Sequence, residues 1–162
     1  MFLRKDDVHL AIEKVQDNQI IGIPTETVYG LGVDPYSQIA IEKLFKIKER
    51  DDTKPISLLI HSFTEIHKLN ISTEIPEIVE LYWPGPLTIV VEVNEPFLSG
   101  IGTTNPNSVG IRVPENVLAI ELLKKTGPLA VTSANISGRN ESKNHIEAEK
   151  IFRASVAAYL EG

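Results

Sequence analysis

Cysteine is absent from the 162-residue sequence. This absence excludes disulfide frameworks, thiolate zinc sites, iron–sulfur clusters and catalytic thiols. A surplus of positive charge is missing too, because 16 Lys+Arg stand against 22 Asp+Glu and give a formal net charge of −6. Nonspecific nucleic-acid binding depends on excess positive charge, so this balance argues against a protein that coats nucleic acid regardless of sequence. A local basic cleft remains compatible with it.

Long hydrophobic runs are missing as well. No segment approaches the roughly 20 apolar residues that a membrane span needs, and the charged residues 4–7 interrupt the start of the chain where a secretory signal needs an apolar core. We therefore expect no membrane association and a cytoplasmic location. The 42% hydrophobic and 23% charged composition is ordinary for a globular protein, and the length predicts a single domain over 1–162.

Apolar spacing alternates between helical and extended periods along the chain. The spacing predicts helices at about 6–17, 39–47, 63–69, 75–82, 115–125 and 145–153, and strands at about 20–23, 56–60, 87–93, 109–113, 129–132 and 156–160. Ser37 or Asp34 is a candidate cap for the second helix. Because helices and strands alternate without hairpin signals, we expect an α/β fold with a twisted, open, mixed sheet and flanking helices.

Two segments near the first strands are rich in residues that contact ligands. Residues 24–32 read PTETVYGLG, and their hydroxyls, carboxylate and glycines suggest a ligand-facing loop; a capped strand–turn–helix connection is the alternative. Further on, Lys48 and Arg50 point to the same side if the backbone is extended, and Lys54 adds a third charge. Such a clamp suits a polyphosphate, and a solvated helix end is the alternative.

Two later segments carry polar groups at strand ends. Arg112 lies inside an apolar strand, where it needs an anion, either a protein carboxylate or a ligand carboxylate, unless the strand is an edge strand and the arginine faces water. Ser133 and Asn135 place a hydroxyl and an amide on one side of another strand end. These groups suit a ribose, a phosphate or a magnesium-bound water, and a capped turn is the alternative.

Several familiar sites have no counterpart in the sequence. The four histidines lack metal-ligand spacing, and no Walker A, G-x-G-x-x-G or G-x-S-x-G string occurs. We therefore expect no metal held by protein ligands and no tightly bound organic cofactor.

Five strings in this order resemble the YrdC-like family of threonylcarbamoyl-AMP synthases over about residues 8–162. They are the 24–32 string, the K-x-R of Lys48 and Arg50, the W-P-G-P-L-T of 83–88, the V-G-I-R-V-P of 109–114, and the S-x-N of Ser133 and Asn135. Any one string is a weak signal, whereas five in the family's order are specific.

The resemblance implies a nucleotidyltransferase that joins L-threonine, bicarbonate or CO2, and ATP with Mg²⁺ into L-threonylcarbamoyl-adenylate, with release of pyrophosphate. A tRNA-threonylcarbamoyl transferase complex would consume the product, at adenosine 37 of tRNAs that decode ANN codons. The implied fold has a large, positively charged concave cleft. The relatives continue past the equivalent of Gly162, so the resemblance also implies that this domain lacks their C-terminal closing segment.

The family's site residues carry over position by position. Lys48 and Arg50 match the cationic, catalytic pair facing the nucleotide phosphates, whereas Thr27 and Arg112 match threonine-binding positions. The other expected nucleotide-binding residues are Lys54, Ser108, Ser133 and Asn135. An RNA-binding module with possible direct tRNA contact, or an inactive paralogue using the same cleft, is the alternative function.

Overall fold

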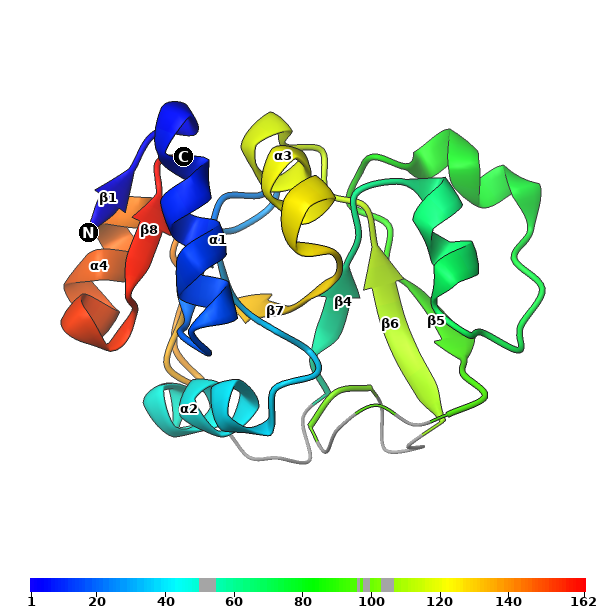
Figure 1. Ribbon diagram of the computed structural model, residues 1–162, viewed down its shortest axis with the longest axis horizontal. Coiled ribbons are helices and arrows are strands. Elements are labelled where there is room, and N and C mark those ends of the chain that lie inside the picture. Colours follow the sequence, from blue (N-terminus) through cyan, green and yellow to red (C-terminus); the bar gives the residue numbers. More distant parts are fainter. Residues whose placement is uncertain (50–54, 96, 98–99, 103–106) are drawn as a thin grey trace.

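The computed structural model describes residues 1–49, 55–95, 97, 100–102 and 107–162, and a mixed eight-stranded sheet runs through them (Figure 1). The strands are β1 (Phe2–Leu3), β2 (Ile21–Ile23), β3 (Gly30–Val33), β4 (Ser57–Leu59), β5 (Ile89–Glu92), β6 (Ser108–Arg112), β7 (Leu129–Ser133) and β8 (Ala158–Leu160). Their order is β1-β8-β2-β3-β7-β4-β6-β5. Parallel pairs join β1 to β8, β8 to β2 and β4 to β6, and the remaining pairs are antiparallel. The predicted mixed α/β fold is confirmed.

In the described part of the chain, four α-helices flank the sheet, each close to a predicted helix. They are α1 (Val8–Gln16), α2 (Gln38–Lys48), α3 (Val117–Thr126) and α4 (His145–Phe152). The side chain of Ser37, not that of Asp34, caps α2 by accepting a hydrogen bond from the backbone N–H of Ala40. The two short helices predicted between β4 and β5 are 3₁₀-helices, at Phe63–Lys68 and Glu77–Tyr82. None of the described helices is both long and apolar enough to cross a bilayer.

Two of the described strands, β1 and β3, were not predicted. Residues 30–33, expected to be loop, form β3, which pairs antiparallel with β2 and β7 near the centre of the sheet. The glycines serve close packing here, because a Cβ on Gly30 would lie 2.8 Å from Cγ1 of Val131, and one on Gly32 would clash with the side chain of Ile23. The loop of the 24–32 string is therefore confined to the turn between β2 and β3.

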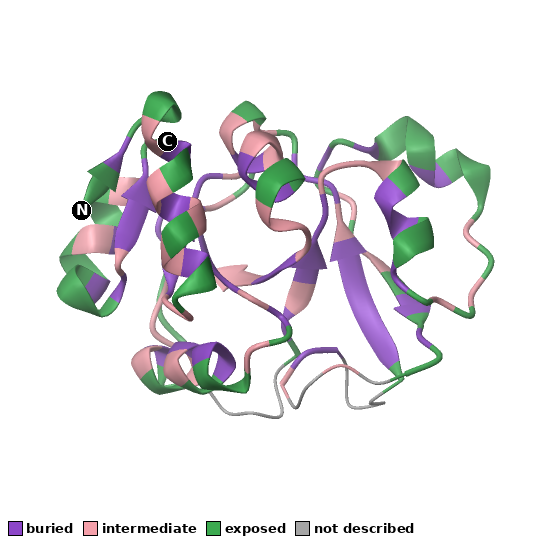
Figure 2. Cartoon of the chain, viewed as in Figure 1, coloured by how far each residue is buried: buried purple, intermediate pink, exposed green. Residues whose placement is uncertain are grey.

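The apolar core lies on both faces of the sheet. On one face α1 packs against α3, β2 and β8, and on the other α2 packs against β3 while α4 packs against β2 and β8. Adjacent strand residues divide between the faces, as Leu58 and Leu59 do in β4. Figure 2 shows that the strands are largely buried, whereas the helices are only partly so. The sheet is thus a fixed platform, and the polar motifs gather at the ends of its strands.

Candidate active site

A pocket of about 140 Å³ opens where the ends of several strands meet. Three of the predicted site residues line it: Thr27 from the β2–β3 turn, Arg112 from the end of β6 and Ser133 from the end of β7. Ser57 of β4 and Thr88, just before β5, add hydroxyl groups. The sheet order therefore collects side chains that lie more than 100 residues apart in the sequence, and gives the pocket both hydrogen-bond donors and acceptors.

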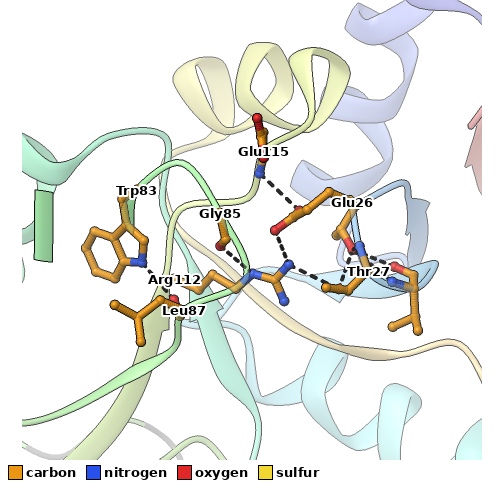
Figure 3. A network of polar contacts seen from close by, with 9 residues as sticks. Glu26, Thr27, Trp83, Gly85, Leu87, Arg112 and Glu115 are labelled. Carbon is orange, nitrogen blue, oxygen red and sulfur yellow. Dashed lines mark hydrogen bonds and ion pairs between the residues drawn. The ribbon is translucent and has the colours of Figure 1, made fainter. Parts of the chain in front are cut away.

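Arg112 meets a protein carboxylate, one of the alternatives that the sequence left open. Its Nη2 atom forms an ion pair with Oε1 of Glu26 and donates to Oγ1 of Thr27 over 3.0 Å, while its Nε atom donates to the carbonyl of Gly85 over 3.1 Å (Figure 3). The other carboxylate oxygen, Oε2 of Glu26, accepts from the backbone N–H of Glu115 over 3.0 Å. Because β6 lies between β4 and β5, the edge-strand alternative is wrong.

The Arg112–Glu26 pair is largely buried. The side chains of Arg112 and Glu26 are 15% and 17% exposed. The turn that supplies the Gly85 carbonyl is held in place, because the backbone N–H of Gly85 donates to Val113 and the indole of Trp83 donates to the carbonyl of Leu87. The guanidinium is therefore fixed from three sides.

Hydrogen bonding in the β2–β3 turn orients the Thr27 hydroxyl. The Thr25 hydroxyl donates its only proton to the carbonyl of Val28 over 2.6 Å. In the 3.1 Å contact between the two threonine hydroxyls, Thr27 must then be the donor. Since Arg112 already donates to Thr27, the Thr27 oxygen keeps one lone pair for a ligand. Thr27 is thus set up to accept a hydrogen bond.

The second cluster joins the K-x-R and S-x-N motifs. Lys48, at the end of α2, is only 1% exposed, and its ammonium donates to the carbonyl of Ser133, to the carbonyl of Asn135 over 2.7 Å and to Oδ1 of Asn135 over 3.3 Å. The Ser133 hydroxyl donates to the same Oδ1 over 2.7 Å. The buried cation therefore ties α2 to the end of β7 and fixes both polar residues of the S-x-N motif.

The remaining predicted residues are less close to the pocket or outside the described part of the chain. Ser108 is buried at the start of β6, the opposite end of that strand from Arg112. Arg50 and Lys54 lie outside the described residues. Among the residues that the structure describes, no group of three or more acidic, histidine or cysteine side chains is arranged to hold a metal ion.

Sequence reasoning missed two members of the network, Glu26 and Thr25. Both belong to the PTET string that was singled out, and a signal for Glu26 was present. Arg112 required an anion, and a carboxylate lay next to the predicted ligand residue Thr27.

Comparison with solved structures defines the class of protein first. The crystal structure of Pyrococcus abyssi Sua5 complexed with L-threonine matches with a TM-score of 0.88 and 28% identity, over 100% of this chain and 49% of that one. Escherichia coli YciO matches with a TM-score of 0.82 over 100% of this chain and 84% of its own, and at 20% identity it supports the fold alone. The structure is thus an open α/β domain of the Sua5 and YciO type.

Sequence comparison then gives the family. The model for Sua5, YciO and YrdC proteins, described as "Telomere recombination", matches residues 13–162. The threonylcarbamoyl-AMP synthase of Pseudomonas fluorescens is 33% identical over 96% of this chain and 84% of its own length. That of P. abyssi is 30% identical over 96% of this chain, which spans about half, 46%, of that protein. The chain belongs to the Sua5/YciO/YrdC family, a family with nucleotidyltransferases among its members, as the sequence predicted.

Proposed function

We propose that this protein synthesises L-threonylcarbamoyl-adenylate from L-threonine, bicarbonate or CO2, and ATP, with release of pyrophosphate. The observation that carries the proposal is the pairing of Arg112 with Thr27 at one pocket. A guanidinium donor beside a hydroxyl acceptor matches the two ends of an α-amino acid, whose carboxylate accepts and whose amine or side-chain hydroxyl donates hydrogen bonds. The L-threonine complex of P. abyssi Sua5 supports this assignment.

The proposed reaction has two steps. The amine of threonine attacks CO2 with loss of a proton, or bicarbonate with loss of water, to form a carbamate, and a carbamate oxygen then attacks the α-phosphorus of ATP while pyrophosphate leaves. Neither step uses a covalent nucleophile from the protein, which suits a chain without cysteine. The protein's part is to position the reactants and to neutralise developing negative charge.

The residues divide between the two substrates. Arg112 holds the threonine carboxylate through Nη1, and Thr27 accepts from the amine or hydroxyl of threonine. On the ATP side, Lys48 acts as a buried positive charge that also fixes Ser133 and Asn135. Arg50, Lys54 and Ser108 complete the nucleotide site in this proposal, and Mg²⁺ enters bound to ATP rather than on protein ligands.

The product's fate follows from its chemistry. A mixed anhydride of a carbamate and AMP is an activated acyl donor, so a transferase must consume it. We place that step at adenosine 37 of ANN-decoding tRNAs, catalysed by a tRNA-threonylcarbamoyl transferase complex, and we place the protein in the cytoplasm, where ATP and tRNA are found.

The test is release of pyrophosphate from ATP, measured with threonine or bicarbonate omitted in turn. We expect release only when both are present, and loss of release in Arg112→Ala. Release that is indifferent to threonine would contradict the proposal. Tight, salt-sensitive tRNA binding without turnover would instead favour the RNA-binding alternative.

A further inference from the structure

The ion pair between Glu26 and Arg112 limits what the arginine can offer a ligand. A guanidinium has five N–H groups, and three of them are used: Nε on the Gly85 carbonyl and both protons of Nη2 on Glu26 and Thr27. Among the described residues nothing accepts from Nη1, which points away from Glu26 in Figure 3. A ligand carboxylate therefore meets one nitrogen of Arg112 rather than a two-nitrogen fork.

Glu26 is itself fixed at both oxygens. Oε1 is paired with Arg112, and Oε2 accepts from the backbone N–H of Glu115, at the approach to α3. This arrangement depends on the length of the glutamate side chain, because one carboxylate bridges the end of β6 and the approach to α3. A shorter aspartate cannot make both contacts at once without movement of the backbone.

The pair also changes the charge that a ligand meets. A guanidinium and a carboxylate in direct contact carry no net charge, so the pair attracts an arbitrary anion far less than a lone arginine does. With both side chains less than one-fifth exposed, solvent screens this effect only in part. Binding at such a pair depends on the direction of hydrogen bonds more than on charge.

We propose that Glu26 is a positioning residue of the amino-acid site: it presents Nη1 of Arg112 in one orientation and suppresses binding of anions that lack the other groups of the ligand. The inference rests on the proposed function for the identity of the ligand, L-threonine. The suppression of simple anions follows from the pair alone. Glu26 would thereby set selectivity without contacting the reacting atoms.

The test uses NMR titrations of the ¹⁵N-labelled full chain with L-threonine and with butyrate, which has the carboxylate and carbon chain of threonine without its amine and hydroxyl. The same spectra report whether each variant is folded. In Glu26→Gln the countercharge is lost, and we expect butyrate to bind about tenfold more tightly than to the wild type. The matched control is Glu115→Gln, which removes an exposed carboxylate next to the pair and should change both affinities less than about twofold.

Glu26→Asp keeps the negative charge but shortens the side chain, so it tests the two effects separately. It also replaces Glu26→Gln as the test variant if Glu26→Gln does not fold. We expect butyrate binding to stay within about twofold of the wild type, because the charge is kept, while threonine binds about tenfold more weakly, because the bridge to Glu115 is lost. Unchanged butyrate affinity in Glu26→Gln, or unchanged threonine affinity in Glu26→Asp, would overturn the proposal. If the wild type binds threonine but releases no pyrophosphate, the proposed function fails while this inference stands. If the wild type does not bind threonine, the butyrate titration of Glu26→Gln alone decides whether Glu26 suppresses the binding of simple anions.

Discussion

Replacement of Lys48 by methionine should destabilise the protein, even though Lys48 lies at a proposed catalytic site. The side chain is 1% exposed, and its ammonium donates to the carbonyls of Ser133 and Asn135 and to Oδ1 of Asn135. Methionine fills nearly the same volume, so the substitution removes the bonds and the charge without creating a large cavity. The buried acceptors then lose their donor.

The magnitude follows from two opposing contributions. Three hydrogen bonds from a charged donor contribute about 1.5–3 kcal/mol each. Removing the ammonium also removes its desolvation cost, which is several kcal/mol. The difference is a loss of about 3 kcal/mol in the free energy of unfolding, which for a chain of this size lowers the melting temperature by about 6–12 °C.

Thermal unfolding followed by circular dichroism measures this difference. The control is Lys46→Met, which makes the same change in the last turn of the same helix at an exposed position and should alter stability by less than about 0.5 kcal/mol. Equal melting temperatures for the two variants would refute the argument, because they would mean that the Lys48 ammonium contributes no net stability.

Two further predictions concern the hydroxyl groups around the β2–β3 turn. Thr25→Val removes the acceptor that orients the Thr27 hydroxyl and should weaken L-threonine binding about tenfold. Thr25→Ser keeps the hydroxyl, and its affinity for L-threonine should stay within about twofold of the wild type. Equal affinities for the two variants in calorimetry would contradict the proposed orientation of Thr27 by Thr25. The hydroxyl of Tyr29 donates to the carbonyl of Leu160 over 2.7 Å, and burial raises the pKa of this phenol well above its ordinary value of about 10. A raised folded-state pKa stabilises the protein below the unfolded-state pKa and loses that contribution as the pH rises above it. Tyr29→Phe should therefore cost about 1 kcal/mol at pH 7 in urea unfolding, and the difference from the wild type should shrink above about pH 10; a constant difference would contradict the assignment.

The helices were the part of the fold most open to prediction. Their apolar residues recur at three and four positions, and Ser37, Asn116 and Asn144 stand at their starts, where the structure finds each one capping a helix. The strand β3 was not predictable in this way. Gly30 and Gly32 favour turns by local propensity, and only the close approach of β2 and β7 explains why a central strand contains them.

The site was partly predictable for a different reason. The need of Arg112 for an anion follows from local chemistry and from its place in an apolar strand. Which carboxylate meets that need depends on a contact across 86 residues, and 22 acidic residues were candidates. The enclosure of Lys48 by backbone carbonyls was hidden for the same reason, because no side-chain pattern marks a backbone acceptor.

The most direct test of the proposed synthase is the fate of labelled bicarbonate. The wild-type chain, incubated with ATP, Mg²⁺, L-threonine and ¹³C-bicarbonate, should form an adenylate whose mass contains AMP, threonine and one labelled carbonyl carbon. The amount of this adenylate should equal the amount of pyrophosphate released. Conversion of ATP to AMP or ADP without a labelled threonine adenylate would contradict the proposed function.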